Sequence, residues 1–121
     1  MIATQTDYGY DLAMTRGDTE SLTVTMTADV DGTTQPFDAA EAVLTVRDKR
    51  DGIKIFEIDA TSLDNGVAVF DFPHALTCDL AAGKYVYDVQ ATTSEGVVKT
   101  PLGGLKSPCR FTLYQDVTYD D

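Results

Sequence analysis

The stretch Leu80-Ala81-Ala82-Gly83-Lys84-Tyr85-Val86-Tyr87-Asp88-Val89-Gln90 decides the fold class. Within it, Tyr85, Tyr87 and Val89 occupy every second position, and the alternation continues to about Thr93. A period of two places successive side chains on opposite faces, which is typical of a β-strand with one face buried. This stretch therefore predicts a long strand in the second half of the chain.

Most of the remaining segments alternate in the same way between turn signals. Leu22, Val24 and Met26 point to one side of a strand expected over Asp18–Ala28. The other expected strands are Tyr10–Met14, Ala42–Asp48, Ile53–Ile58, Val67–Phe72, Val97–Thr100 and Arg110–Tyr114. The turn signals between them include Asp31-Gly32, Arg50-Asp51-Gly52 and Asn65-Gly66. Seven to eight short strands with frequent turns predict an all-β sandwich.

One short helical link interrupts the strands. His74–Leu80 is the only stretch expected to be helical, for one or two turns, and Gly83 is expected to end it. Tyr85 then stands at the start of a late strand, the place of the tyrosine corner in immunoglobulin-like folds, where the hydroxyl binds backbone across the corner. We therefore predict an immunoglobulin-like antiparallel β-sandwich. The absence of Trp excludes an antibody-type domain.

Length and charge limit the organisation and the partners. A chain of 121 residues fits one domain over 1–121, with ends at about 1–7 and 115–121 that are flexible or docked on a partner. Twenty acidic and nine basic residues give a net charge of -11. Such a field repels phosphate backbones and anionic membranes, which argues against nucleic acid and membrane partners. The charge either keeps a small domain soluble or attracts a basic protein.

The chain shows no targeting segment and little sign of redox chemistry. The start has no basic region followed by an apolar one, and no apolar run is long enough to span a membrane. We therefore expect a product of the cytoplasm, in which Cys78 and Cys109 are free thiols in preference to one disulfide.

The side chains that carry chemistry are few. His74 is the only histidine, and Cys78 follows four residues later at helical spacing, which leaves a small hydrolase as a weak alternative. Three scattered Cys and His residues cannot supply the four ligands of a zinc site. The Asp pairs in loops are better explained by turns than by calcium. The sequence therefore predicts no enzyme, no metal, no cofactor and no small-molecule substrate.

The tripeptide Arg16-Gly17-Asp18 matches a familiar integrin ligand, but its position favours another role. It lies between two expected strands, where Gly permits a sharp bend and Asp opens the next strand. We interpret the tripeptide as a structural bend that separates the two strands.

The order of these features resembles a known family. Tyr10 to Thr19 leads into an alternating strand, Leu44 to Asp48 forms a later one, and Gly83 to Gln90 follows the helical link. Phe111 to Leu113 and Asp116 to Thr118 close the series. It is similar to immunoglobulin-like virion proteins of phages and prophages, related to the N-terminal domain of the baseplate upper protein, over about Tyr8 to Thr118.

The resemblance implies a structural protein of a tailed phage virion, in the tail, baseplate, neck or head surface. It would act through contacts with other virion proteins, as a homo-oligomer or docked on a ring. A carbohydrate- or host-surface-binding module is the alternative. Tyr is favoured at interfaces because it joins a large apolar face to a polar tip. The candidate interface residues are Tyr8, Tyr10, Tyr114, Val117 and Tyr119.

Overall fold

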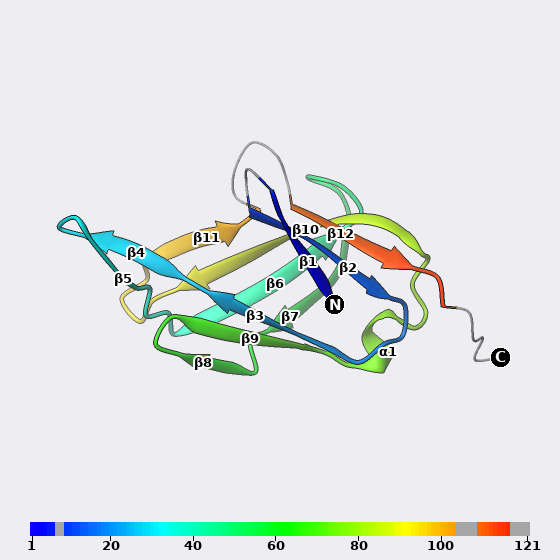
Figure 1. Ribbon diagram of the computed structural model, residues 1–121, viewed down its shortest axis with the longest axis horizontal. Coiled ribbons are helices and arrows are strands. Elements are labelled where there is room, and N and C mark those ends of the chain that lie inside the picture. The colour runs from blue at the N-terminus through cyan, green and yellow to red at the C-terminus, as the bar shows by residue number, and fades with distance from the viewer. Residues whose placement is uncertain (7–8, 104–108, 117–121) are drawn as a thin grey trace.

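The computed structural model describes residues 1–6, 9–103 and 109–116, which form twelve strands and one short helix (Figure 1). Sheet A has the order β1-β2-β12-β10-β6-β7, and β11 pairs with the second half of β10. Its strands are β1 (Ile2–Thr6), β2 (Gly9–Thr15), β6 (Glu41–Arg47), β7 (Lys54–Asp59), β10 (Gly83–Thr92), β11 (Val98–Leu102) and β12 (Cys109–Tyr114).

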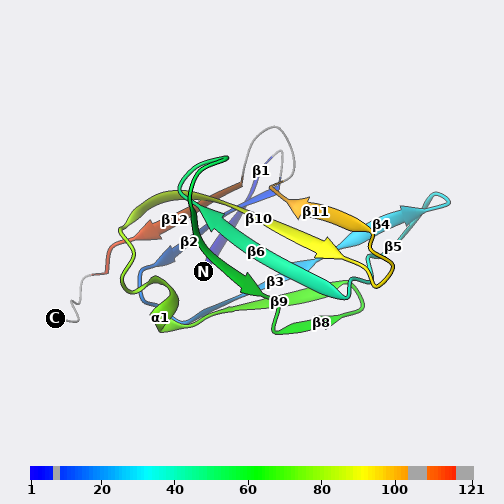
Figure 2. The same cartoon turned by 180° about the vertical axis from the view of Figure 1, so that it is seen from behind.

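Sheet B and a separate hairpin complete the architecture. Sheet B has the order β3-β9-β8, built from β3 (Glu20–Thr25), β9 (Val67–Phe72) and β8 (Ser62–Asp64). β4 (Thr27–Val30) and β5 (Thr33–Pro36) pair as a two-stranded sheet. The helix α1 (His74–Thr77) connects β9 to β10. Figure 2 shows β6, β10 and β11 in front, with sheet B below and behind them.

The inward-facing residues of both sheets form one apolar core. Val24 and Phe70 from sheet B and Leu44, Val89 and Phe111 from sheet A all belong to it. The rings of Phe72 and Phe111 stack with centroids 6.1 Å apart across the two sheets. Because these positions alternate with exposed ones along each strand, the period of two in the sequence produces this core directly.

The predicted fold class is confirmed, with two differences. The chain is an immunoglobulin-like β-sandwich with one short helical link, but it has twelve strands in the described residues instead of seven to eight. The sheets are also not wholly antiparallel. β12 pairs with β2 in parallel, with Phe111 opposite Leu12 and Leu113 opposite Met14. The sequence gives no sign of strand direction, since the same alternation serves both.

The additional strands lie where the alternation is absent. β1, β4, β5 and β8 are short and mostly exposed, so their residues carry no periodic apolar signal. Ile2–Thr6, which lies in the end expected over 1–7 to be flexible or docked on a partner, pairs with β2 along its whole length. The N-terminal amine of Met1 also forms an ion pair of 2.6 Å with Glu20.

The helical link differs in length from the prediction, and a tyrosine corner follows it. α1 ends at Thr77, not Leu80, and Gly83 opens β10 instead of ending the helix. The Tyr85 hydroxyl donates a hydrogen bond of 2.5 Å to the Ala81 carbonyl. This is the contact that defines a tyrosine corner. It fixes the loop before β10 to the strand that follows it.

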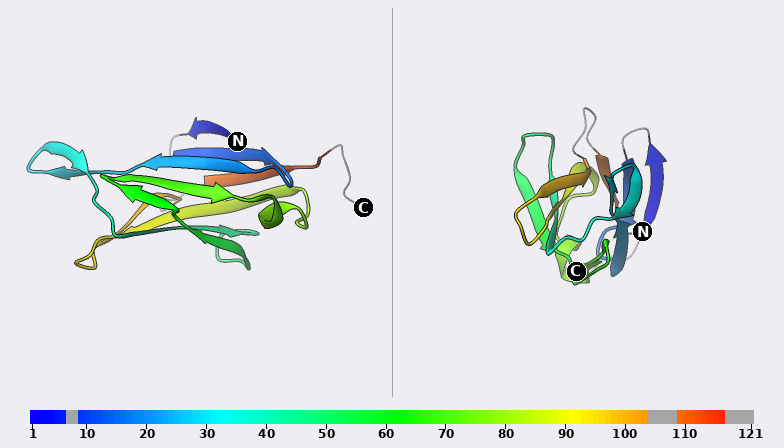
Figure 3. Two further views of the ribbon diagram at one scale, coloured as in Figure 1. Left: turned by 90° about the horizontal axis from the view of Figure 1, so that it is seen from below. Right: turned by 90° about the vertical axis from the view of Figure 1, so that its left-hand side faces the viewer.

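The β4–β5 hairpin, which we call the arm, projects from one end of the sandwich (Figure 1). α1 lies toward the opposite end of the long axis, as the left view of Figure 3 also shows. Asp31 and Gly32 at the arm's tip have φ values of 51° and 79°. Two successive positive φ values make a type I′ turn, whose twist suits a two-residue hairpin. The turn expected at Asp31-Gly32 is therefore confirmed.

Candidate functional site

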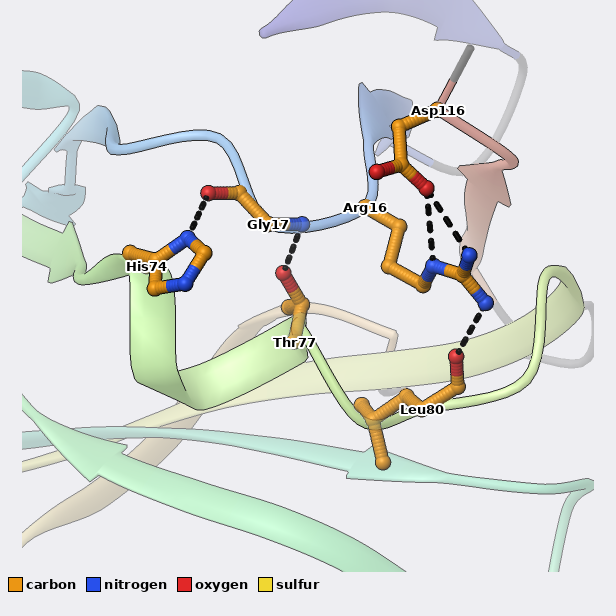
Figure 4. A network of polar contacts seen from close by, with 6 residues as sticks. All are labelled: Arg16, Gly17, His74, Thr77, Leu80 and Asp116. Atoms are coloured by element: carbon orange, nitrogen blue, oxygen red, sulfur yellow. Dashed lines mark hydrogen bonds and ion pairs between the residues drawn. The ribbon is translucent and has the colours of Figure 1, made fainter. Parts of the chain in front are cut away.

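The two ends of the sandwich hold the features that could carry function, and the α1 end is the more elaborate (Figure 4). Arg16, in the turn after β2, forms an ion pair with Asp116 through Nη2 at 2.8 Å and Nε at 3.2 Å. A third nitrogen, Nη1, donates to the Leu80 carbonyl at 3.4 Å. Hydrogen bonding to Arg16 lowers the pKa of the Asp116 carboxyl. One guanidinium thus joins three segments that are distant in the sequence.

Gly17 connects the same turn to α1. Its N–H donates to Thr77 Oγ1 at 2.8 Å, and its carbonyl accepts from His74 Nδ1 at 2.6 Å. Because a carbonyl can only accept, His74 Nδ1 carries the proton. Thr77 is fully buried, and a buried hydroxyl needs such a partner. Gly17 has φ of 82°, in the left-handed region that favours glycine. We call Arg16, Gly17, His74, Thr77 and Asp116 the junction.

The junction decides how the Arg16-Gly17-Asp18 tripeptide is presented. The Arg16 side chain is turned toward Asp116 and Leu80, and both backbone groups of Gly17 bind α1. Arg16 and Gly17 therefore close the bend between β2 and β3, while Asp18 is exposed. This bend agrees with the structural interpretation of the tripeptide, although the sequence did not indicate that α1 and Asp116 would be the partners of Gly17 and Arg16. Asp116, within the end expected at about 115–121, is held at the junction by Arg16.

The hydrolase alternative depends on His74 and Cys78. His74 uses Nδ1 to hold Gly17, and Cys78 Sγ lies 3.8 Å from the Ala75 carbonyl within its own turn. Cys78 and Cys109 are both free thiols, and Cys109 is buried in the core. His74 Nδ1 is engaged with Gly17, and the expectation that the chain is no enzyme stays a prediction.

The five candidate interface residues separate into two groups. Tyr10 in β2 is 43% exposed and Tyr114 in β12 is 59% exposed, and both therefore offer surface to a partner. Tyr8, Val117 and Tyr119 lie outside the described residues. Sequence reasoning did not reveal a further contact in this region: the hydroxyl of the buried Tyr87 donates a hydrogen bond of 2.5 Å to the Tyr10 carbonyl. Burial away from water raises the pKa of Tyr87.

A polar cleft of about 230 Å³ lies on sheet A between β6 and β10. Two guanidinium groups, Arg47 and Arg50, and two carboxylates, Asp51 and Asp88, line it. Desolvation by burial raises the pKa of the Asp88 carboxyl, with a smaller opposing effect of Arg47. Because the opposite charges balance, this cleft has little net charge with which to select an ion.

Metal and membrane sites were sought in the same residues. Among residues 1–6, 9–103 and 109–116, no three His, Cys, Asp or Glu side chains lie together so that they could hold a metal ion. No helix in this part of the chain is long and apolar enough to span a bilayer. The Asp residues in loops serve turns instead: Asp48 Oδ1 accepts the Ile53 N–H at 2.8 Å. The absence of a cofactor stays a prediction.

The arm is the second candidate. Seven of its eight strand residues are exposed, and the eighth, Ala28, is half-buried. Val30, next to the turn, is 48% exposed although it is apolar. The root of the arm is fixed, since the Met26 N–H donates to the Gly66 carbonyl at 2.7 Å and the Phe37 N–H to the Met26 carbonyl at 3.0 Å. A fixed root thus carries an exposed hairpin.

Comparisons with known proteins give little beyond the fold. No protein-family model matches the sequence, and no curated protein matches it. Among solved structures, the chain is similar to the crystal structure of CopC from Methylosinus trichosporium OB3b. The identity is 12%, the TM-score is 0.48, and the match covers 90% of this chain and 88% of that one. A likeness at this level carries no functional argument.

These findings overturn the resemblance to phage virion proteins. Neither comparison of the sequence yields a phage relative, and the solved structure reported above is not a phage protein by its name. The virion roles, the baseplate assignment and the carbohydrate- or host-surface-binding alternative are withdrawn with it. The physical reason lies in the motifs themselves. Arg16 and Gly17 bind within the junction and Tyr85 forms the corner, so these residues have contacts inside the sandwich and do not by themselves identify a family.

Proposed function

We propose that this chain is a non-enzymatic protein-binding domain that docks onto another protein chain through the β4–β5 arm. The observation that carries the proposal is the exposure of the arm. Within the described residues, β4 pairs with β5 and neither strand joins sheet A or sheet B. A single two-stranded hairpin is at best marginally stable in water, so a hairpin of this kind gains most when a partner covers it.

The arm has the properties of a docking element. Its outer strand edges offer N–H and C=O groups to another strand, and Val30 offers an apolar contact near the tip. The type I′ turn and the hydrogen-bonded root restrict its conformations before any partner arrives. Such preorganisation reduces the entropy lost on binding and raises affinity.

The non-enzymatic part of the proposal rests on the tasks of the reactive side chains. The only histidine of the chain, His74, holds Gly17 in the junction, and Cys109 lies in the core. The charge of -11 favours binding of proteins whose facing surface is basic. The partner expected from this charge is a different protein, because a second copy of this chain would bring two acidic surfaces together.

A site-specific crosslinking experiment tests the proposal. A photo-crosslinking amino acid replaces Val30 in the chain expressed in its source cell, and the adducts are identified by mass spectrometry. The matched control places it at Ile53, an apolar residue that is 73% exposed in the turn between β6 and β7. We expect one dominant protein adduct from Val30 and none of that identity from Ile53. Equal adduct patterns from both sites would overturn the proposal.

A shortened arm provides the quantitative test with the identified partner. Deletion of Asp29, Val30, Thr33 and Thr34 removes two strand pairs and places the native Asp31-Gly32 turn between Ala28 and Gln35. Because the deletion removes an even number of residues from each strand, it keeps the faces of the hairpin. We expect the partner's Kd to increase at least about tenfold, equivalent to about 1.4 kcal/mol. An unchanged Kd would show that the arm does not carry binding.

A further inference from the structure

A second surface lies away from the arm. A shallow groove of about 780 Å³ runs from the start of β3, across the end of β9, to the edge strand β7. Its apolar floor includes Ile58, Phe72 and Pro73. Its other lining residues are polar or acidic, and no Lys or Arg is among them. We call it the β7 groove.

Open strand edges border the β7 groove. β7 is the last strand of sheet A and pairs with β6 on one side. β8 pairs with β9 over Val67–Val69, so the described chain leaves the rest of β9 without a strand on that side. A strand edge presents unsatisfied N–H and C=O groups, and an extended peptide can pair with them.

The negative charge of the β7 groove favours a partner with basic residues. Four carboxylates line it: Glu20, Glu57, Asp59 and Asp71. Glu20 pairs with the N-terminal amine and Glu57 with Lys54, whereas Asp59 and Asp71 form no ion pair with any described residue. A partner that supplies Lys or Arg would therefore meet uncompensated negative charge. Two copies of this chain pairing through β7 would instead bring carboxylates together, which is destabilising.

The alternation along β7 defines the pattern of the partner strand. Phe56 packs inward against Phe72 and Phe111, and Ile58 follows on the same side. Glu57 lies on the opposite, outer face, where it accepts a hydrogen bond from Thr45, and Asp59 follows it there. Neighbouring strands place paired side chains on the same face. A strand added to β7 would thus set basic residues beside Glu57 and Asp59 and apolar residues over the groove floor.

We infer that the β7 edge binds an extended segment of a partner protein in which Lys or Arg alternates with apolar residues. The inference extends the proposed function from the arm to a second surface, and it depends on the chain being a protein-binding domain. Backbone pairing supplies affinity, while Glu57 and Asp59 supply the preference for basic segments.

Peptide binding tests the inference. The probe is a fluorescein-labelled (Lys-Val)₃ peptide, and its controls are the (Glu-Val)₃ peptide and a (Lys-Val)₃ peptide with alternate backbone nitrogens methylated. Methylation removes donors needed for strand pairing and leaves the charge intact. We expect binding of the first peptide, measured by fluorescence polarisation, to be at least about tenfold tighter than binding of either control. Equal binding of the methylated peptide would overturn strand addition.

Matched variants locate the site. Glu57→Gln with Asp59→Asn removes two charges at the groove, and Asp29→Asn with Asp64→Asn removes two charges elsewhere. We expect the first pair to weaken binding at least about tenfold and the second pair by less than about twofold, since the first alone faces the added strand. Equal losses would indicate only attraction to a negative chain and would overturn the inference. If Val30 forms an adduct but the β7 edge does not bind the peptide, the inference on β7 is overturned and the proposed function stands. If the β7 edge binds the peptide but Val30 forms no adduct, docking through the arm is overturned and the inference on β7 stands.

Discussion

The α1 end and the arm end of the molecule use polar groups in opposite ways. At the junction, side chains of Arg16, His74 and Thr77 bind backbone or carboxylate groups of other segments. In the arm, β4 and β5 bind each other and present their remaining groups to solvent. The sandwich thus fixes one end for stability and leaves the other available for contact. Four experiments test this contrast.

The root of the arm should give the largest effect. Gly66 has φ of 80°, and a Cβ there would lie 2.7 Å from the Met26 carbonyl oxygen. Gly32 at the tip has φ of 79° and open space around it. Gly66→Ala combines backbone strain with a steric clash, so we expect about 3 kcal/mol of destabilisation in urea unfolding. Gly32→Ala is the matched control and should cost below about 1 kcal/mol, because the arm can relax locally. Equal costs would contradict a fixed root and a free tip.

The junction should give the next effect through Thr77. Thr77→Val keeps the shape of the side chain but removes the acceptor of the Gly17 N–H. A donor left without a partner in a buried place costs about 1–3 kcal/mol, and we expect about 2 kcal/mol in urea unfolding. Thr23→Val, at an exposed position of β3, is the control and should change stability by less than about 0.5 kcal/mol. A loss below that value at Thr77 would show that the junction does not stabilise the fold.

The ion pair of the junction should give a smaller effect that depends on pH. Arg16 lowers the pKa of Asp116 in the folded chain, so the stabilisation is present above the unfolded value of about 3.9. It is lost as the pH falls through the lowered folded pKa. We therefore expect Asp116→Asn to reduce Tm at about pH 7 and to match the original chain at low pH. Asp64→Asn should show no such convergence. A constant Tm difference at all pH values would contradict the assignment.

Shortening the arm should give the smallest effect on stability. The deletion of Asp29, Val30, Thr33 and Thr34 removes exposed residues that contribute nothing to the apolar core. We expect Tm and the urea midpoint to correspond to a change within about 0.5 kcal/mol. A larger loss would mean that the arm stabilises the sandwich, and the contrast between the two ends would fail.

Much of the fold could be predicted from residues whose period matches the burial. The alternation around Leu22, Val24, Tyr87 and Val89 placed β3 and β10, and Asn65-Gly66 and Asp31-Gly32 placed two turns. β4, β5 and β8 were missed because exposed strands of Thr, Asp and Gln have no apolar face to reveal them. The arm, on which the proposed function rests, was therefore the part that sequence periodicity could least reveal.

The functional family was predicted wrongly for a related reason. Arg16-Gly17-Asp18 and the Gly83–Gln90 strand were interpreted as signs of ancestry, although Gly17 and Tyr85 in them make contacts within the fold that do not depend on a family. Tyr10 and Tyr114 are exposed as a partner surface requires, and whether they contact a partner stays a prediction. The candidate site lay elsewhere, in an exposed hairpin and an edge strand.

The sequence by itself determined the class of fold, since the alternation of apolar and polar residues sets which faces are buried and the Gly-containing pairs set where the chain reverses. Only the tertiary structure decided the parallel pairing of β2 with β12, the partners of Arg16 and Thr77, and the open edges of the arm and β7. The reason is that period and turn chemistry act between neighbours in the chain. Pairing partners and free edges depend on segments such as Arg16 and Asp116, which meet only when the whole sandwich closes.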